Sequence, residues 1–310
     1  MAPYHSTLNL IGKTPLVRLS KLSPSGSSIW VKVESQNPGG SIKDRPAFHI
    51  LEKAYQSGEL KKGQPVVEMT SGNMGAGLAV VCSVMGNPLI VVMSRGNSIE
   101  RVKMMDALGA QVVLVDQVDG APGQVTGADM KAAVEMAKAI SNEKGGYYVD
   151  QFNNPGSPDA HERSTGPEIF ESLGKSLTAF VSVVGSGGTF VGTARFLKKH
   201  YPSVICAAVE PYGAEILAGK KIEKPRHLLQ GAGYGVIPGH WDSNLVDQFL
   251  SVTDQEAEEF KRRLAHEEGL HVGFTSGANV CAAIKLIENG SLGASPSVAT
   301  ILCDTGLKYS

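Results

Sequence analysis

Short apolar runs rich in valine and isoleucine alternate with longer stretches in which apolar residues recur every three or four positions. The short runs predict strands at residues 28–35, 64–69, 88–93, 110–116, 179–184, 204–211 and 298–304. The longer stretches predict helices at residues 46–58, 75–86, 100–109, 128–145, 190–200, 253–269 and 278–290. Because helices follow most strands and the strand runs are almost wholly apolar, the pattern predicts an α/β fold whose mostly parallel, twisted sheets are flanked by helices.

Glycines mark the ends of several predicted helices. Gly86, Gly109 and Gly269 each follow such a stretch, where a left-handed residue commonly ends a helix. The glycine- and aspartate-rich segment 116–130 has no periodicity and predicts a long loop. A loop of this length is either a functional, mobile segment or a solvated connector, and the sequence favours neither.

Composition narrows the class of protein. The chain has 310 residues, 42% hydrophobic and 19% charged, which is typical of a soluble globular protein with two lobes or one large α/β unit. A net charge of -1 gives no sign of a nucleic acid or membrane partner. The N-terminal stretch resembles no secretory leader, and no run approaches the ~18 apolar residues of a membrane span.

The cysteines agree with this class. The chain has four, each inside an apolar run and without a C-x-x-C pair: Cys82, Cys206, Cys281 and Cys303. This usage favours buried thiols in a reducing compartment. We therefore expect a cytoplasmic protein, and we expect no metal site.

Three glycine-rich loops stand before predicted helices. They are "NPGGSIKDR" at 37–45, "TSGNMGAG" at 70–77 and "GSGGTFVG" at 185–192. In a parallel sheet such loops gather at the carboxyl ends of the strands, where ligands bind. The unpaired amides of a helix N-terminus favour an anion, and glycine lets the anion approach closely.

The third loop is the best candidate for binding a phosphate. It is no Walker A loop, because no Gly-Lys-Ser/Thr follows, and Phe190 occupies the third glycine position of the dinucleotide pattern G-x-G-x-x-G. Glu210 nevertheless ends the next predicted strand, about where a ribose-binding acid would stand. A nicotinamide site and a plain tight turn therefore stay open beside the phosphate site.

The other two loops allow a structural and a functional interpretation each. Ser71, Asn73 and nearby amides suit a carboxylate or a phenolic oxygen, but the same loop fits a turn capped by Thr70 or Ser71. Lys43 is either a solvated lysine at a helix start or a reactive amine. The positive end of the helix and Arg45 would lower the pKa of Lys43 and leave free amine to attack a carbonyl.

Taken together, the motifs resemble one family along nearly the whole chain, the fold type II pyridoxal-phosphate enzymes of the cysteine synthase and cystathionine β-synthase group. In chain order they read "IGKTPLVRL", "NPGGSIKDR", "TSGNMGAGLA", "SIERVKMMDALGA", "DQFNNP", "TGPEI", "GSGGTFVGTARFLK", "VEP", "QGAGYGVIPG", "GFTSGAN" and "CDTGLKYS". The resemblance implies a tryptophan synthase β-like fold. It also implies a small mobile lobe at 39–149 that closes over the substrate, and a large cofactor-anchoring lobe at 1–38 and 150–310.

The same resemblance assigns the cofactor contacts. Lys43 matches the lysine that binds pyridoxal 5'-phosphate as a Schiff base and then moves protons. Asn73 matches the hydrogen-bond partner of the cofactor's ring oxygen. Thr275 matches the hydroxyl that faces the ring nitrogen, with Ser276 as the neighbouring alternative. The phosphate cradle corresponds to Gly185, Ser186, Gly187, Gly188 and Thr189.

The resemblance also assigns residues to the substrate. Thr70, Ser71 and Gln151 match positions that bind the substrate's carboxylate, and Gly231 matches a loop that lines the cleft in relatives. Met74 departs from the family, because it replaces the second threonine of T-S-G-N-T-G. It removes a hydroxyl and adds apolar bulk beside the carboxylate site, unless it is a packing variant. The long segment 116–130 and the start of "MSRGNSIE" are further departures, and all three bear on the choice of substrate.

The implied reaction is replacement at the β-carbon of an activated serine. O-acetyl- or O-phosphoserine would lose its leaving group to give an aminoacrylate, which a small nucleophile such as sulfide then attacks. A hydroxyl at the ring nitrogen makes the cofactor a weaker electron sink than a carboxylate would, which favours prompt expulsion of the leaving group. Relatives are usually homodimers.

Several alternatives stay open. One is another β-substituting synthase, of the cystathionine, cyanoalanine or diaminopropionate type. A second is a lyase that eliminates from cysteine or serine. The remote alternatives are an NAD-dependent oxidoreductase and an inactive homologue that binds a partner.

Overall fold

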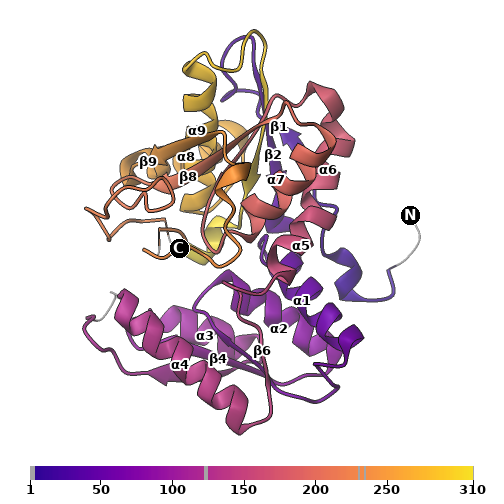
Figure 1. Cartoon of the computed structure of the whole chain (residues 1–310), viewed down its shortest axis with the longest axis vertical. Coiled ribbons are helices and arrows are strands. Elements are labelled where there is room, and N and C mark those ends of the chain that lie inside the picture. The colour runs from indigo at the N-terminus through magenta and orange to yellow at the C-terminus, as the bar shows by residue number, and fades with distance from the viewer. Residues whose placement is uncertain (1–3, 122–124, 230, 234, 310) are drawn as a thin grey trace. The chain divides into compact units, whose positions relative to one another are not determined.

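The contacts within the chain divide it into two units. The structure, a computed structural model, describes residues 4–121, 125–229, 231–233 and 235–309 (Figure 1). Unit 1 consists of Met1–Ile11 and Asn37–Ser157, and unit 2 consists of Gly12–Gln36 and Pro158–Ser310. Each unit contains a sheet covered by helices, which confirms the predicted α/β class with mostly parallel sheets.

Unit 2 contains a six-stranded sheet in the order β1-β2-β10-β7-β8-β9. Every pair of neighbouring strands is parallel except β1 with β2. The strands are β1 (Leu16–Arg18), β2 (Ser28–Val33), β7 (Ala179–Val183), β8 (Ile205–Pro211), β9 (Gln248–Val252) and β10 (Ser297–Leu302). The central strands are buried along nearly their whole length, as expected of a parallel sheet covered on both faces.

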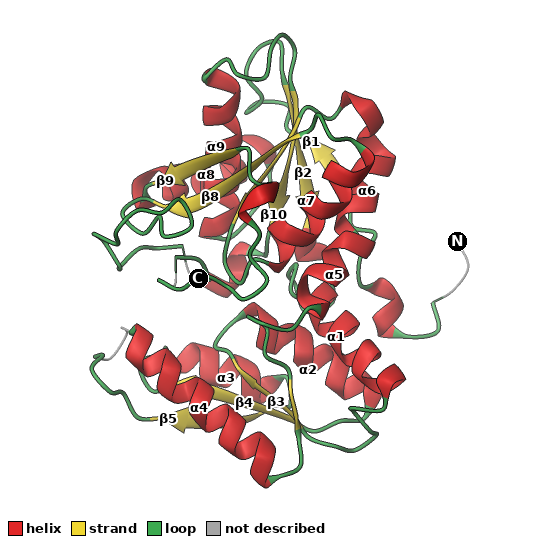
Figure 2. Cartoon of the chain, in the orientation of Figure 1, coloured by secondary structure: helices red, strands yellow, loops and turns green. Residues whose placement is uncertain are grey.

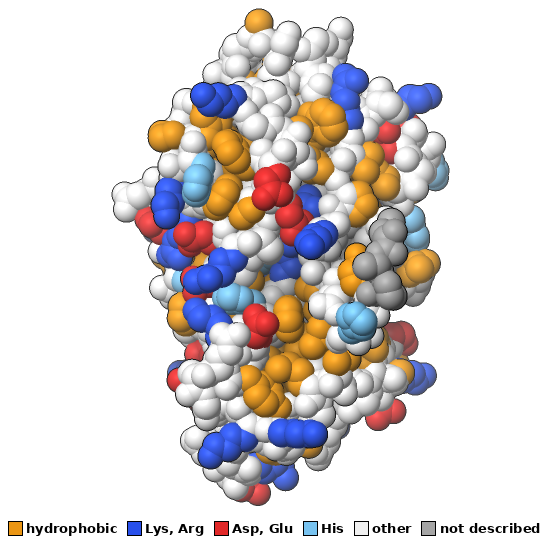
Figure 3. All heavy atoms as spheres, turned by 90° about the vertical axis from the view of Figure 1, so that its right-hand side faces the viewer, with side chains coloured by type: hydrophobic (Ala, Val, Ile, Leu, Met, Phe, Trp, Pro, Cys, Tyr) orange, Lys and Arg blue, Asp and Glu red, His pale blue; other side chains and the backbone are white. Residues whose placement is uncertain are grey.

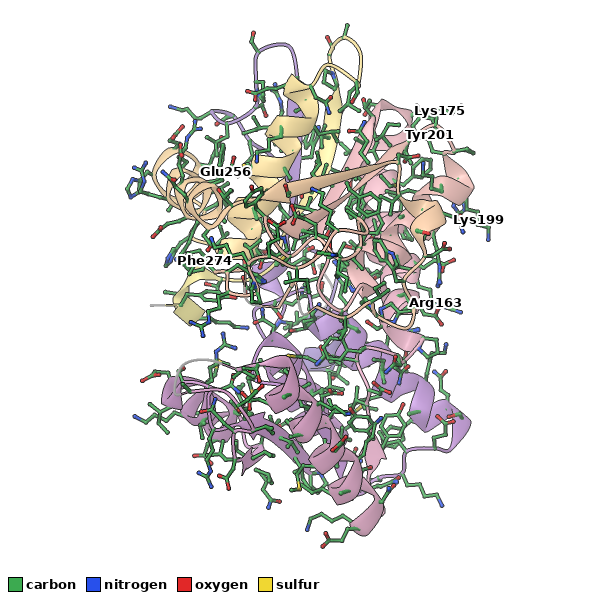
Figure 4. The ribbon with its side chains drawn as sticks, turned by 60° about the vertical axis from the view of Figure 1, so that its left-hand side comes forward. Arg163, Lys175, Lys199, Tyr201, Glu256 and Phe274 are labelled. Carbon is green, nitrogen blue, oxygen red and sulfur yellow. The ribbon has the colours of Figure 1, made fainter. Side chains whose placement is uncertain are left out.

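Helices cover both faces of this sheet. Figure 2 shows α8 and α9 on one side and α6 and α7 on the other. The helices are α5 (Gly156–Arg163), which begins at the border of the units, α6 (Thr165–Leu173), α7 (Gly188–His200), α8 (Asp254–Glu268) and α9 (Phe274–Glu288). Thr253 and Glu256 form a capping box at the start of α8, and Glu256, labelled in Figure 4, also accepts a hydrogen bond of 2.8 Å from Lys285 Nζ on α9.

Unit 1 contains a four-stranded parallel sheet in the order β5-β4-β3-β6. Its elements are β3 (Val66–Met69), β4 (Leu89–Ser94), β5 (Gln111–Val115), β6 (Tyr147–Tyr148), α1 (Asp44–Ser57), α2 (Asn73–Met85), α3 (Ile99–Ala107) and α4 (Gly127–Glu143). Two hydrophobic clusters lie in this unit. One joins α1, α2 and α3 to the sheet, and the other joins α4 to the sheet.

The predicted strands and helices all appear, with ends that shift by a few residues. Gly86, Gly109 and Gly269 adopt φ of 77°, 84° and 72°, so the predicted left-handed conformation at the helix ends is confirmed. The sequence pattern missed β1, β6, β9, α5 and α6. The missed strands are very short or lie at a sheet edge, and the missed helices have only eight and nine residues, shorter than the 11–18-residue window over which helical periodicity stands out.

The division into units differs from the lobes expected at 39–149 and at 1–38 with 150–310. Residues 1–11 belong to unit 1, where Leu8 and Ile11 pack against the cluster of α1 and α2. Residues 150–157 also belong to unit 1, because the Gln151 backbone amide donates to Glu68 on β3. The short sequence stretches at the borders carry no signal of these long-range contacts.

The predicted loop at 116–130 is shorter than expected, because α4 begins at Gly127. Its residues 122–124 lie outside the described part of the chain. Asp129 on the first turn of α4 accepts hydrogen bonds from the backbone amides of Val118 (2.6 Å) and Thr126 (3.0 Å). The two ends of the loop are therefore bound to the start of the helix.

The surface and the cysteines agree with the composition. Charges of both signs are interspersed on the face drawn in Figure 3. Cys82, Cys206 and Cys281 are buried and Cys303 is half-buried, and all four are free thiols. Among the described residues, no helix combines the length and the apolar character that crossing a bilayer requires.

Candidate active site

Lys43 stands immediately before α1 in unit 1. Its backbone amide donates to Ser41 Oγ at 3.2 Å, and the buried Asp44 carboxylate accepts a hydrogen bond from the Gly39 amide. A Cβ on Gly39 would lie 2.6 Å from the same carboxylate, so the loop packs directly against the Asp44 side chain. The loop that carries Lys43 is therefore fixed at both ends by hydrogen bonds.

Helix α2 also fixes the backbone of Lys43. A Cβ on Gly77, in the second turn of α2, would lie 3.0 Å from the carbonyl oxygen of Lys43 and 3.1 Å from Asp44 Cα. Only glycine lets the two helices approach this closely. The glycine-rich stretch at 70–77, predicted to bind a ligand, is thus also needed for packing around Lys43.

The loop at 70–73 forms the second part of the site in unit 1. Thr70 Oγ1 accepts from the Gly72 amide at 3.3 Å, and Arg101 Nη1 donates to the carbonyl oxygen of Ser71 at 2.7 Å. Gly72 precedes α2 without a side-chain cap, and α2 has no acidic residue in its first turn. These features suit an anion such as a carboxylate, because the helix start offers amides and a positive dipole end.

Gln151 lies beside this loop. Its Nε2 is 3.3 Å from the carbonyl oxygen of Met69 and 3.5 Å from Glu68 Oε1. Its backbone amide donates to Glu68 Oε2 at 3.3 Å. The sequence motif "DQFNNP" identified Gln151 but not Glu68. The one sign of Glu68 in the sequence is that it is a charged residue inside an apolar strand.

Met74 lies in the core of unit 1. Only 2% of its surface is exposed, and it belongs to the hydrophobic cluster that includes Leu78 and Met105. These contacts favour the packing interpretation of the substitution. Compared with the threonine of the family pattern, Met74 also lacks a hydroxyl.

The loop at 185–189 in unit 2 connects β7 to α7. Gly187 has φ of +88° and precedes α7 without a side-chain cap, and no acidic residue stands in the first turn. A Cβ on Gly185 would lie 1.9 Å from the carbonyl oxygen of Gly231, and one on Gly187 would lie 3.1 Å from His240 Nε2. This cradle of glycine amides at a helix's positive end fits the phosphate of pyridoxal 5'-phosphate.

His161 supports the cradle and was missed by the sequence reasoning. It is fully buried, with Nε2 3.3 Å from Thr189 Oγ1 and Nδ1 2.9 Å from Thr165 Oγ1. Thr165 is the first residue of the "TGPEI" motif, and His161 lies four positions before it. The motif therefore pointed to this part of the chain but not to its contact with Thr189.

Thr275 and Ser276 begin α9. Ser276 is fully buried, and its hydroxyl accepts from the Cys303 amide at 2.9 Å. Thr275 is half-buried and follows Phe274, which is labelled in Figure 4 and packs edge-on against Tyr309. Because Ser276 is fully buried against the Cys303 amide and Thr275 is only half-buried, Thr275 is the better candidate to face a ring nitrogen.

Glu210 does not behave as a ribose-binding acid. Its two carboxylate oxygens accept from the amides of Leu217 (2.8 Å) and Ala218 (3.0 Å). The carboxylate therefore stabilises the chain after β8. The observation that kept a nicotinamide site open thus has a structural explanation.

The expected site residues fall into two groups. In unit 1 the structure gathers Lys43, Thr70, Ser71, Asn73, Met74 and Gln151 on or beside α1, α2 and β3. In unit 2 it places the loop at 185–189 against Gly231, and it places Thr275 and Ser276 at the start of α9. Unit 1 thus carries Lys43 and the loop at 70–73, which suits a carboxylate, and unit 2 carries the loop at 185–189, which fits a phosphate, and the Thr275 hydroxyl.

An α/β fold with a fixed lysine at one helix start and a glycine-rich loop that fits a phosphate at another is what a pyridoxal-phosphate enzyme requires. The model of the family described as "Pyridoxal-phosphate dependent enzyme" matches residues 7–304, and the chain belongs to this family. The cofactor is therefore pyridoxal 5'-phosphate, as expected. The assignment gives no support to a nicotinamide cofactor.

Individual relatives are also similar over the whole chain. A cysteine synthase of Staphylococcus aureus (strain N315) is 40% identical over 309 residues, which cover 99% of this chain and 96% of the relative. The solved structure of an O-ureido-L-serine synthase has a TM-score of 0.91 and 35% identity, covering 99% of this chain and 94% of the other. An O-acetylserine dependent cystathionine β-synthase from Helicobacter pylori has a TM-score of 0.89 and 33% identity, covering 100% and 98%.

Proposed function

We propose that the protein replaces the β-substituent of an activated L-serine, O-acetyl- or O-phospho-L-serine, and forms cysteine when sulfide is the nucleophile. The observation that carries this proposal is Lys43, fixed at the start of α1 in the same unit as the anion-binding loop at 70–73. The names of similar proteins, cysteine synthase and an O-acetylserine dependent synthase among them, support the same chemistry.

Pyridoxal phosphate, when bound, withdraws electrons from the substrate's α-carbon. The Nζ of Lys43 is the amine that would bond to it and then carry the proton from that carbon. The amides at 185–189 would bind the phosphate, and the Thr275 hydroxyl would face the ring nitrogen. Asn73 would bind the ring oxygen, and Thr70, Ser71 and Gln151 would orient the substrate by its carboxylate.

Borohydride reduction tests the role of Lys43. Purified enzyme should be yellow, and reduction should attach the cofactor to the peptide that contains Lys43. Lys43→Ala should abolish turnover and this labelling. Lys53→Ala, which changes an exposed lysine on the same helix, should preserve both. A protein that binds no pyridoxal phosphate, or that is labelled elsewhere, would contradict the assignment.

A spectral screen tests the substrate. O-acetylserine, O-phosphoserine, serine and cysteine are mixed separately with the holoenzyme, and the visible spectrum is recorded. We expect an immediate change with one of the two activated serines, reversed by sulfide with release of cysteine. A change reversed only by homocysteine or another amino acid would instead identify a different β-substituting synthase. Pyruvate release without any nucleophile would identify a lyase.

We also propose that the enzyme is a homodimer in the cytoplasm, as the family resemblance implied. Four free thiols, three of them buried, are compatible with a reducing compartment. Light scattering coupled to gel filtration should give twice the mass of one chain. The mass of a single chain would refute the dimer.

A further inference from the structure

Strands β7 and β10 are neighbours in the six-stranded sheet, but they pair over only part of their length. Their register stops after Phe180 and Ala299, two residue pairs into the ladder, whereas β10 pairs with β2 over six residues. The structure describes both strands completely, and the last three residues of each lie beyond this ladder. The two strands therefore stop pairing before β7 reaches the loop at 185–189.

Side chains take the place of the missing ladder. Continued in the same register, a parallel ladder would join the Val183 amide directly to the Ile301 carbonyl oxygen. The side-chain amide of Asn279, on α9, bridges them instead: its Oδ1 accepts from the Val183 amide at 2.6 Å, and its Nδ2 donates to the Ile301 carbonyl oxygen at 2.7 Å. Thr300 Oγ1 likewise donates to the Val181 carbonyl oxygen at 2.7 Å. Buried backbone groups that have lost their ladder thus keep a partner.

The chemistry of this bridge is specific. Asn279 is fully buried, and its orientation is fixed because the Val183 amide can only donate and the Ile301 carbonyl oxygen can only accept. A leucine at this position would leave both backbone groups unpaired. A carboxylate would accept from the amide but would repel the carbonyl oxygen. A neutral carboxylic acid, with one donor and one acceptor, could replace the amide.

The bridge joins two parts of the candidate active site. Asn279 lies four positions after Thr275, so the two side chains belong to the same face of α9. Val183 is the last residue of β7 and lies two positions before the loop at 185–189. One side chain therefore connects the helix that carries the Thr275 hydroxyl to the strand that leads into the glycine-rich loop.

We propose that Asn279 is a positioning residue that sets the separation between the loop at 185–189 and the Thr275 hydroxyl. A pyridine ring is rigid, so a cofactor held at once by its phosphate and by its ring nitrogen requires both partners at one separation. The amide bridge holds the two strand ends at one spacing, and with them the loop and the start of α9. The inference rests on the proposed function, because it takes the loop and Thr275 as contacts of the cofactor.

The test measures how much the phosphate contributes to cofactor binding. The quantity is the Kd of pyridoxal divided by the Kd of pyridoxal phosphate, measured with apoprotein prepared from the holoenzyme. Asn279→Leu should lower this ratio about tenfold, the factor that corresponds to loss of about one buried hydrogen bond. Asn87→Leu is the matched control, because Asn87 is buried in unit 1 and donates to the Lys61 and Gln64 carbonyl oxygens, each at 2.9 Å. The control should lower stability and leave the ratio unchanged.

Asn279→Asp adds a readout that a purely structural role would not move. Burial raises the pKa of an aspartic acid above its ordinary ~3.9, so at about pH 5.5 the neutral acid should replace the amide and keep the wild-type ratio. At about pH 8.5 the ionised acid should lower the ratio about tenfold, because it repels the Ile301 carbonyl oxygen. Strands β7 and β10 contain no ionisable side chain, and the Cys303 thiol lies 3.6 Å from Nδ2. Each value is therefore compared with wild type at the same pH.

Failure of this inference and failure of the proposed function are read from different proteins. An unchanged ratio in Asn279→Leu, or a ratio in Asn279→Asp that is the same fraction of wild type at both pH values, would overturn the role of Asn279 even in an active enzyme. Equal Kd values of the two compounds in wild type would instead contradict the cofactor contacts of the proposed function. Because these measurements need no substrate, a wild type that binds the cofactor but reacts with neither activated serine would overturn the proposed reaction alone.

Discussion

Gly77 places a backbone rather than a side chain against the backbone of Lys43. The first two turns of α2 therefore have two roles under the proposed function, because Asn73 begins the helix next to the loop at 70–73 and Gly77 approaches the Lys43 carbonyl. A family motif indicates that glycine belongs at position 77. It does not indicate what the glycine touches.

Gly77→Ala should reduce turnover more than it reduces stability. The added Cβ would lie 3.0 Å from the Lys43 carbonyl oxygen, so the lysine backbone must shift by a few tenths of an ångström. We expect a loss of about tenfold or more in kcat/KM, since small displacements of a reacting group are costly, and overpacking of about 1–3 kcal/mol. Gly127→Ala, at an open position on α4, is the control and should change neither. Unchanged turnover in Gly77→Ala would show that the Lys43 backbone tolerates the shift.

Arg101→Gln should weaken substrate binding. The guanidinium donates to the Ser71 carbonyl oxygen at 2.7 Å and brings a positive charge to the loop. Loss of a charged hydrogen bond is worth about 1.5–3 kcal/mol, so KM for the activated serine should rise roughly tenfold or more while kcat changes little. Arg95→Gln removes an exposed arginine that pairs with Asp116, and it should leave KM unchanged. Steady-state kinetics of the two variants would decide.

Residue identities could be predicted from the sequence where a motif carries them. Lys43, the loop at 70–73 and the glycines at 185–188 each had a recognisable pattern. Glu68 and His161 belong to no such pattern, because their contacts are with Gln151 and Thr189, 83 and 28 positions away in the chain. A single sequence records which residues are present but not which buried polar groups meet.

At the scale of elements, the last residue of α8, Glu268, binds the turn at residues 20–22. The Glu268 carboxylate accepts from the backbone amides of Ser20 (3.0 Å), Lys21 (2.6 Å) and Leu22 (2.8 Å). Burial alone would raise the pKa of Glu268, but these amides outweigh it and hold the pKa below its ordinary value. One side chain thus satisfies the three backbone amides of residues 20–22, which lie in no helix or strand.

Glu268→Gln should destabilise the protein by about 1–2 kcal/mol at neutral pH, measured by urea unfolding. Because the folded pKa is depressed, the stabilisation is fully present above the ordinary glutamate pKa of ~4.3 and is lost as the pH falls below it. The difference between wild type and variant should therefore shrink in acid. Glu267→Gln, the adjacent residue that pairs only with Arg263 on the surface, should show no measurable change. Equal effects of the two variants would contradict the role given to Glu268.

Elements were predictable where apolar periodicity was long enough to show. The buried strands β4, β7 and β8 appear directly as apolar runs. Strand β9 has a mixed burial pattern at the sheet edge, and β6 has only two residues, so both depend on a partner strand that the local sequence does not reveal.

For the whole molecule, the cofactor should contribute measurably to stability. Removal of pyridoxal phosphate should lower Tm by about 4 °C, because a ligand present at 100 times its Kd adds about 2.7 kcal/mol and a chain of this length unfolds with an entropy of about 0.65 kcal/mol/K. Pyridoxal, which lacks the phosphate, should restore less of this than pyridoxal phosphate if the loop at 185–189 binds the phosphate. Thermal unfolding of the apoprotein with each compound measures the difference. Equal rescue by both would argue against the phosphate cradle.

The parallel, helix-covered architecture was predictable for the whole chain, but the borders of the units were not. The sequence shows no linker at Ile11, Gln36 or Ser157, where the division falls. The borders depend on which hydrophobic cluster receives Leu8 and Ile11, and such a choice is decided by three-dimensional packing.

The pairing of β2 with β10 has a consequence for biosynthesis. Strand β2 ends at Val33, and its parallel partner β10 ends at Leu302, so the partner leaves the ribosome roughly 270 residues later. At translation rates of about 5–20 residues per second, this delay is roughly 15–50 s. Throughout this delay the edge of β2 that pairs with β10 has no native neighbour, whereas the last strand of the four-stranded sheet, β6, emerges only about 115 residues after Val33. The nascent chain therefore exposes an unpaired apolar strand edge, which is the kind of segment that chaperones bind.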